Sequence, residues 1–421
     1  MLILAAGFVI RVVWCIVAAR TPTNFGDPFS YVQHADEIAR GQGYHVWFSD
    51  VPTAYYPVGY PGLLGILLWL TRLVLPSATA MQVAIGANLA AGTATIGLVH
   101  DLTVRVVSRR AARLAAAAVA LFPSLVLYSA TAYLETVFTF LVVLVAWLLV
   151  GPWPAVPRPT GRRLVLLGVT LGAAGLVRPI ALAALPMLLV VWWAVGAGGR
   201  RALLWTVATT GVVVVVILPW TLRSSLALGG VVAISTNTGD NLCIGHSPQS
   251  DGQYKDLDAW CWDGFETVPR DRLEVTRDAA NRRAAIEFAL SHPGREAQLL
   301  VRKAWFLVRH DHEGVYAVES YGADPFLAPP LRTALKVWAD SWYAVVVICA
   351  AAGAVIAVRR RDRALVTLLA WAVTLLAVPL VFFGGSRFHL PALPFAAVFA
   401  AVAVDAALTR RGGRGPDPAL T

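Results

Sequence analysis

Four charged side chains stand out because each lies where an apolar stretch begins or ends. Asp27 follows the first apolar stretch, Glu135 opens a later one, and Arg178 and Arg387 lie in short turns between two others. A carboxylate can accept the proton of an attacking hydroxyl, and a guanidinium can hold a phosphate through two parallel hydrogen bonds. Together they indicate a group transfer in which a phosphate departs.

Each of these side chains also has a plainer interpretation. Asp27 precedes Pro28 and could cap a helix, because Asp is a good capping residue and Pro suits the first turn. Glu135 could form an ion pair with Arg178. The arginines, Arg387 included, could anchor helices at the membrane surface by extending toward water.

A loop rich in tyrosine and proline follows Asp27 and runs from Tyr44 to Pro61. Proline and glycine favour turns there, and tyrosine places a hydroxyl on a rigid apolar ring. We expect part of this loop, together with His389 beside Arg387, to form the wall of a substrate site. The tyrosines expected in that wall are Tyr44, Tyr55, Tyr56 and Tyr60.

The composition identifies a membrane protein. Of the 421 residues, 57% are hydrophobic and only 14% are charged, and apolar runs of spanning length recur. The basic excess consists mostly of arginine in loops, as the positive-inside rule requires, so it does not indicate nucleic-acid binding. The first apolar run contains Arg11 and ends at Arg20 without a small-residue cleavage site, so we expect no cleavable signal.

The arginine clusters set the expected topology of an all-α polytopic fold. Placing them in the cytoplasm gives ten helices with both ends of the chain inside. The apolar run 62–75 is too short to cross a core of roughly 30 Å at about 1.5 Å per residue, so we expect an interfacial helix there. The expected spans are 1–20, 82–106, 111–128, 134–150, 164–178, 180–196, 202–220, 337–358, 364–383 and 391–408.

These spans divide the chain into three parts. Residues 1–220 form a membrane module of about seven helices with an external loop at 21–61, and 337–421 form a C-terminal module of about three. Residues 221–336 form an external insertion rich in helix. In it we expect one helix over 277–290, a break at His292-Pro293-Gly294, and a second helix to about Arg309, which either lies on the membrane surface or packs on the insertion.

Cysteines and histidines add two smaller expectations. Cys243 and Cys261 lie in the external insertion, where disulfides persist, and we favour a bridge between them; Cys15 and Cys349 lie in spans. The run from His310 to Glu313 contains typical metal ligands, but adjacent residues of a helix point apart and the spacing fixes no tetrahedral set. The sequence therefore assigns no metal site and no required cofactor.

Several motifs, taken in chain order, resemble the GT-C superfamily of membrane glycosyltransferases, in the bacterial branch near the protein O-mannosyltransferases and the lipid A aminoarabinose transferase. The likeness covers nearly the whole chain. The motifs are Gly26-Asp27 with Tyr31 and Gly43-Tyr44, Tyr56-Pro57-x-Gly59-Tyr60-Pro61, Glu135, Gly175-Leu176-x-Arg178-Pro179, Pro219-Trp220-x-x-Arg223, Thr236-Asn237-x-Gly239-x-Asn241-Leu242-x-x-Gly245 and Arg387-x-x-Leu390-Pro391.

The resemblance implies an inverting transfer of a hexosyl or pentosyl group from a polyprenyl-phosphate sugar to a hydroxyl of a protein, lipid or cell-envelope glycan. It implies an active site on the outer face of the cell membrane, with Asp27 as general base and Glu135 positioning the acceptor or contacting a metal. Arg387 and Arg178 would bind the donor phosphate. A divalent ion held by Glu135 and one histidine is left open.

A transporter or flippase of lipid-linked sugars is the alternative function. Its expected signature is an internal repeat with paired broken helices near the middle of the membrane. The sequence shows no such repeat, and its polar residues gather outside the spans.

Overall fold

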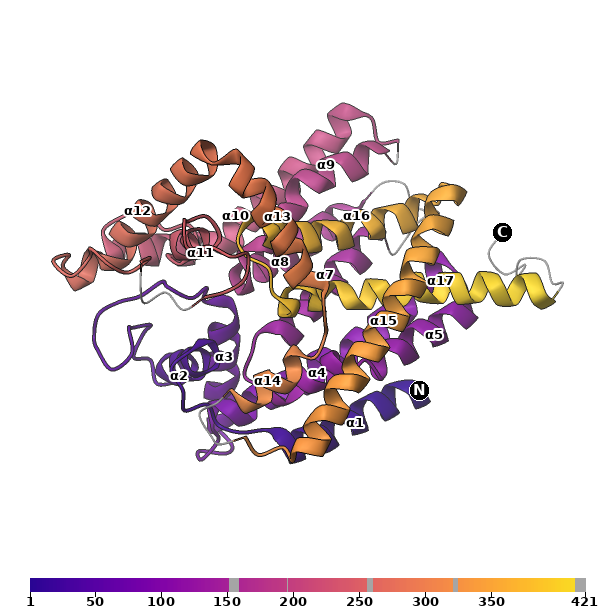
Figure 1. The fold of residues 1–421 in the computed structure, drawn as a ribbon, viewed down its shortest axis with the longest axis horizontal. Helices are drawn as coiled ribbons and strands as arrows, with labels where there is room; N and C mark the ends of the chain where they lie inside the picture. Colours follow the sequence, from indigo (N-terminus) through magenta and orange to yellow (C-terminus); the bar gives the residue numbers. More distant parts are fainter. Residues whose placement is uncertain (151–158, 195, 256–259, 321–324, 413–421) are drawn as a thin grey trace.

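The computed structural model describes residues 1–150, 159–194, 196–255, 260–320 and 325–412, and they form helices joined by turns (Figure 1). In chain order the helices are first α1 (Leu2–Ala18), α2 (Asp27–Ala39), α3 (Gly59–Arg72), α4 (Ala80–Val106), α5 (Arg109–Ala120), α6 (Pro123–Leu127), α7 (Glu135–Val150), α8 (Gly161–Val177), α9 (Ala184–Ala194) and α10 (Gly199–Leu228). These are followed by α11 (Thr238–Gly245), α12 (Arg270–Ser291), α13 (Pro293–Val308), α14 (Glu313–Glu319), α15 (Pro329–Arg360), α16 (Arg363–Ala377) and α17 (Leu393–Gly412). Short 3-10 helices are η1 (Tyr128–Ala130), η2 (Pro179–Ala183), η4 (Val378–Val381) and η5 (Ser386–Ala392).

The all-α polytopic fold expected from the sequence is confirmed. Each expected span coincides with a helix, although several of these helices are short. Among the described residues, five helices are long and apolar enough to cross a membrane: α4, α10, α15, α16 with η4, and η5 with α17. A sixth results if α5 and the segment after it form one span, bent by 57°. At about 1.5 Å per residue, the 17 residues of α1 cover roughly 26 Å of a core near 30 Å. The number of ten crossings therefore stays a prediction.

The N-terminus and the last turns of α17 lie at the same end of the helices (Figure 1). In Figure 1 the N-terminus and the last turns of α17 lie at the right, whereas α2, α11 and α12 lie at the left. Nε of Arg110, at the start of α5, pairs with Asp405 near the end of α17 at 2.5 Å. The arginine-rich ends of these two helices thus share one side, opposite the insertion.

Arg11 is buried inside α1 and is paired internally, as its position in an apolar run requires. Nη1 donates to the carbonyl oxygens of Gly7 and Ala120, both at 3.0 Å, and Nη2 donates to that of Val119 at 3.2 Å. These last two carbonyls belong to the end of α5, which stops before Pro123. The guanidinium therefore pairs with backbone carbonyls at the end of α5, where proline interrupts the hydrogen bonds of the helix.

At the opposite end, the first loop and the insertion meet. The expected interfacial helix begins at Gly59, three residues earlier than predicted, and packs against α2 and α4. The break in the insertion falls at His292, between α12 and α13, as expected. One face of α13 is buried at Leu299 and Leu307, whereas Val301 and Trp305 on the other face are exposed.

Candidate active site

A cavity of about 190 Å³ lies where the first loop, the end of α8, the insertion and η5 meet. Three of the four charged residues singled out in the sequence reach this cavity, and the fourth, Glu135, bonds to one of them. The polar residues that line it are Asp27, Tyr31, Tyr55, Tyr56, Arg178, Ser235, Asn237, Thr238, Asn241, Tyr254 and Arg387.

Asp27 and Arg387 face each other across the cavity although 360 residues separate them. Nη1 of Arg387 donates to Oδ2 of Asp27 at 2.9 Å, and the two side chains are 26% and 28% exposed. The guanidinium also lies over the rings of Tyr133 and Phe388, at 5.9 and 5.1 Å from their centroids. Gly26 holds the N-cap position of α2, so Asp27 is not the helix-capping residue that its sequence position suggested.

Glu135 and Arg178 form the second pair, with Nη2 of the arginine 2.9 Å from Oε1 of the glutamate. These side chains are only 1% and 12% exposed. The pairing is the plainer interpretation that the sequence allowed for Glu135. Within the described residues, Nη1 of Arg178 is buried and has no hydrogen-bond partner. A buried, unpaired guanidinium donor is suited to an anionic oxygen, because leaving it unpaired is costly.

Tyr55 and Tyr56 contribute the hydroxyls of the wall. Their rings meet edge to face at 5.1 Å, and Tyr56 also packs on Tyr31 at 5.4 Å. Burial raises the pKa of both hydroxyls well above the usual value, and the charges of Asp240 beside Tyr55 and Asp27 beside Tyr56 add to it. Both therefore stay protonated and can donate hydrogen bonds.

Tyr44 and Tyr60 lie behind this wall and do not line the cavity, contrary to expectation. The Tyr44 ring stacks on His34 at 3.9 Å, and its hydroxyl donates to the carbonyl of Tyr56 at 3.1 Å. Tyr60 is fully buried and packs on Tyr31 at 5.4 Å. Tyr44 therefore supports the loop at Tyr56, and Tyr60, in the first turn of α3, supports Tyr31.

His389 was also expected in the wall, and it is buried elsewhere. Its Nδ1 bonds to the carbonyl of Leu307 at 2.6 Å and its Nε2 to Oδ1 of Asp311 at 2.8 Å. Its ring stacks on Tyr343 at 4.8 Å. His389 thus ties η5, which carries Arg387, to the end of α13.

The insertion holds the tyrosine loop through one buried carboxylate. Glu274 on α12 accepts hydrogen bonds from the hydroxyl of Thr53, from the backbone N–H of Ala54 at 3.0 Å and from the hydroxyl of Thr236 at 2.8 Å. Arg223 on α10 donates to the carbonyl of Thr53 at 2.7 Å. These bonds fix the backbone directly before the two tyrosines of the wall.

Two glycines lie where one backbone segment packs directly against another. Gly59 belongs to the motif from Tyr56 to Pro61, and Gly384 lies just before η5. A Cβ on Gly59 would overlap the backbone of Leu176, next to Arg178, so the start of α3 can lie against the end of α8 only with glycine there. A Cβ on Gly384 would likewise overlap the carbonyl of Lys303 on α13. Close approach at these two points brings both arginines to the cavity.

A disulfide joins Cys243 on α11 to Cys261, and it lies next to the cavity. Asn281 on α12 donates to the carbonyl of Cys261 and to Asp240, both at 2.8 Å. The bridge and these bonds hold α11, which presents Asn241 to the cavity.

Comparison with known proteins finds matches for the structure of this chain but none for its sequence. A scan against protein-family models found no match, and a search of curated protein sequences found none either. Solved structures do match. AglB, the oligosaccharyltransferase of Archaeoglobus fulgidus, in complex with an inhibitory peptide and a dolichol-phosphate, gives a TM-score of 0.57 at 16% identity, over 100% of this chain and 52% of that one.

A further AglB structure, in complex with zinc and sulfate, gives a TM-score of 0.55 at 15% identity over 98% of this chain and 50% of that one. The chain thus spans about half the length of AglB. This chain has the GT-C fold. ArnT from Cupriavidus metallidurans, bound to undecaprenyl phosphate, matches with a TM-score of 0.41 at 14% identity over 96% of this chain and 77% of that one.

The zinc in one AglB structure raises the question of whether the cavity of this chain suits a metal ion. Asp27, which lines the cavity, and Glu135, which lies behind Arg178, each face an arginine instead of each other. Among the described residues, neither belongs to a group of three metal-ligating side chains, so the ion left open for Glu135 and a histidine lacks such a set. We derive no step through a metal ion at this cavity.

Several residues that line the cavity were not predicted from the sequence. Asn237 and Asn241 belong to a motif quoted for the GT-C resemblance, but nothing in the sequence assigned them a role. Tyr254, Phe382 and Phe383 carried no signal, because an isolated aromatic residue in a loop is as readily structural as functional. Together with the prolines nearby, the phenylalanines make one side of the cavity apolar.

Proposed function

We propose that this protein is a membrane glycosyltransferase that moves a sugar from a polyprenyl-phosphate donor to a hydroxyl acceptor. The observation that carries the proposal is the single cavity in which a carboxylate, two arginines and two tyrosine hydroxyls lie beside apolar side chains. AglB, which shares the fold, is an oligosaccharyltransferase solved with a dolichol-phosphate, and this supports a lipid-phosphate donor.

The two arginines would bind the donor phosphate. Arg178 offers its unpaired Nη1 to a phosphate oxygen. Arg387 pairs with Asp27, so a phosphate would compete with that carboxylate for the guanidinium. The apolar side chains of Pro379, Phe382 and Phe383 lie along the same cavity and suit the first isoprene units of the donor.

Asp27 would act as the general base. It takes the proton of the acceptor hydroxyl while the acceptor oxygen attacks the anomeric carbon from the face opposite the phosphate. The bond between that carbon and the phosphate oxygen breaks, and polyprenyl phosphate leaves with its charge held by the arginines. One displacement of this kind inverts the anomeric configuration.

Donor binding would itself prepare the base. A carboxylate beside a cation is a weaker base than one without it, because the cation favours the ionised form. When the phosphate draws Arg387 away, the Asp27 carboxylate loses its hydrogen-bond donor and can accept a hydrogen bond from the hydroxyl of the acceptor instead. Tyr55 and Tyr56, which keep their protons, would hold the sugar hydroxyls in place.

We further propose that the cavity faces away from the cytoplasm, on the outer side of the cell membrane. The disulfide between Cys243 and Cys261 supports this orientation, since disulfides persist in oxidising compartments and α11 carries both Cys243 and the cavity residue Asn241. The arginine-rich ends of α5 and α17 lie at the other end of the helices, as the positive-inside rule requires.

The test is transfer from a labelled donor. Membranes containing the protein are incubated with a panel of radiolabelled polyprenyl-phosphate sugars, and the protein, lipid and glycan fractions are counted. We expect label to leave one donor and enter one fraction, and matched membranes with Asp27→Asn to lack this transfer. Movement of intact donor across the membrane with no transfer would overturn the proposal in favour of a transporter.

A further inference from the structure

We propose that His310, His312 and Asp340 form a binding site for a transition-metal ion such as Zn²⁺, outside the cavity. Each of the three offers one ligand atom, and these atoms all lie within 4.8 Å of one another. Two imidazoles and a carboxylate are a common donor set for zinc. None of the three lines the cavity, so the site does not depend on the proposed transfer reaction.

The local backbone brings the two histidines together. α13 ends at Val308 and α14 begins at Glu313, so the residues between them are not helical. The connection bends and turns, with His312 at φ −86° and ψ 11°, and it places both imidazoles on one side. The rings of His310 and His312 stack at 4.1 Å between centroids, with 13° between their planes. The expectation that these side chains diverge assumed a helix, and residues 309–312 are not helical.

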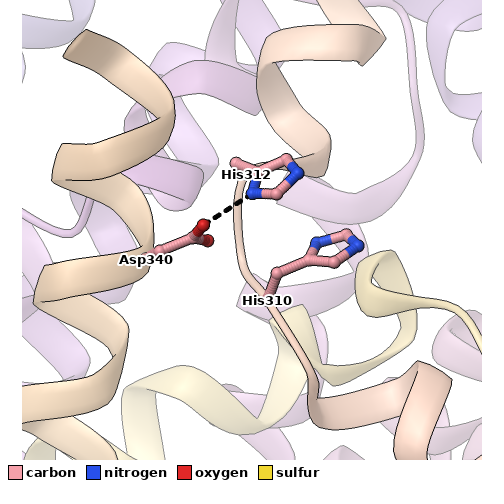
Figure 2. Close-up of side chains that lie close together, drawn as sticks. All are labelled: His310, His312 and Asp340. Carbon is pink, nitrogen blue, oxygen red and sulfur yellow. Dashed lines mark hydrogen bonds and ion pairs between the residues drawn. The ribbon is translucent and has the colours of Figure 1, made fainter. Parts of the chain in front are cut away.

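Asp340 supplies the third ligand from α15, as Figure 2 shows. Its Oδ2 lies 2.7 Å from Nδ1 of His312, and its Oδ1 accepts from the backbone N–H of Asp311 at 2.8 Å. α15 is apolar and long enough to span a membrane. A carboxylate on such a helix is costly unless it has a partner, and its presence there is a reason to look for a function.

His310 provides an independent sign of a ligand-binding site. Its Nδ1 is buried and, within the described residues, has no hydrogen-bond partner. Buried polar atoms are nearly always paired, so an unpaired one needs an explanation. A metal ion bound between the two rings and the carboxylate would supply the missing partner, because the neutral imidazole nitrogen is a common metal ligand.

The ion fits with side-chain rotations alone. Ligand atoms about 2.0–2.2 Å from zinc at tetrahedral positions lie roughly 3.4 Å from each other. The contact between His312 and Asp340 therefore widens by about 0.7 Å as the ion replaces the shared proton, and His310 rotates inward from the 4.8 Å limit. Water takes the fourth position.

The site joins elements that support the cavity. Asp311, between the two histidines, bonds through its carboxylate to His389, two residues beyond Arg387. An ion at this site would lock the connection between α13 and α14 onto α15. Its expected effect is to stabilise the region of η5 in the folded protein, because a ligand that binds only the folded state adds to stability.

The test measures metal binding by the full-length protein in detergent after chelator treatment and dialysis. Zn²⁺ is titrated calorimetrically, and Co²⁺ is added separately to record the visible absorption typical of tetrahedral coordination. We expect one ion per chain in the wild type and a rise in Tm of several degrees with Zn²⁺. His310→Asn and Asp340→Asn should each weaken binding by about 10–100-fold or more and abolish the Tm rise.

His292→Asn is the matched control, because His292 is an exposed histidine between α12 and α13 whose ring, in the described structure, hydrogen-bonds only to Ser291 and the carbonyl of Phe288. It should bind Zn²⁺ as the wild type does. Far-UV circular dichroism and the Tm in chelator establish that each variant is folded. Unchanged affinity in folded His310→Asn or Asp340→Asn, or failure of the intact protein to bind either ion, would overturn the proposal.

Discussion

Two acid–arginine pairs lie at the cavity or directly behind it, and they differ in how far their side chains are exposed. Asp27 and Arg387 are both more than a quarter exposed, whereas Glu135 and Arg178 are nearly buried. The bond between each acid and its arginine measures 2.9 Å in both. The chemistry of the partners is the same, so accessibility alone separates them.

The difference has an energetic consequence. An accessible pair contributes little to stability and can part at little cost, because water solvates both charges. A buried pair cannot part cheaply, since each ion would be left without solvent or partner. We therefore propose that the pair of Asp27 and Arg387 takes part in the chemistry and that Glu135 positions Arg178.

The largest effect should come from Asp27→Asn. The amide cannot take a proton from the acceptor, so turnover at saturating donor should fall by about 10²–10⁴-fold, while the Tm stays close to that of the wild type. Asp36→Asn is the control, because Asp36 pairs with Arg72 at 2.7 Å with nearly the same exposure, 29% and 26%, away from the cavity. A folded, fully active Asp27→Asn protein would remove the base from the mechanism.

Glu135→Gln should act mainly on stability. Removing one charge of a buried pair leaves Arg178 uncompensated, at a cost of about 3–5 kcal/mol in the free energy of unfolding. Thermal or denaturant unfolding in detergent would measure this loss. If the variant instead keeps its stability but loses turnover as Asp27→Asn does, the two pairs share the catalytic role and the contrast between them fails.

A smaller effect is expected for Arg387→Lys. Lysine keeps the charge but loses the planar fork that binds a phosphate bidentately, so the KM for the donor should rise by about tenfold. The same change at Arg178 should lower stability as well, because its guanidinium also bonds to buried Glu135. Comparing KM and Tm for both variants distinguishes the pairs; identical behaviour would contradict the distinction.

The smallest effects should separate the front of the tyrosine wall from its support. Tyr44→Phe removes the hydrogen bond to the carbonyl of Tyr56 and should cost about 1 kcal/mol of stability with little change in KM. Tyr55→Phe, at the cavity, should raise KM with little change in Tm. Reversal of these two outcomes would mean that Tyr44 reaches the substrate after all.

Local patterns in the sequence predicted most of the helices. The break at His292 followed from proline, and the start of α3 came within three residues because Pro61 marks a first turn. The disulfide between Cys243 and Cys261 was predicted because both lie in the same segment, and the structure contains it. Such features depend on neighbours in the chain, so periodicity and breakers suffice.

The site was predicted less completely because it depends on distant contacts. Nothing in a single sequence shows that Asp27 meets Arg387, or that Asp340 lies beside His312. Tyr44 and Tyr55 look alike in composition, and only the bonds of the loop to Glu274 decide which of them faces the cavity. The direction of a side chain in an irregular loop is set by tertiary structure.

The pairing of Arg11 has a consequence for the order in which the chain assembles. The carbonyls that receive its guanidinium belong to Val119 and Ala120, more than a hundred residues later. When α1 is synthesised, these acceptors do not yet exist, and an unpaired arginine in the bilayer is costly. The first helix must therefore wait at the edge of the membrane, or in the insertion machinery, until α5 has been made. The two helices then enter their final positions together.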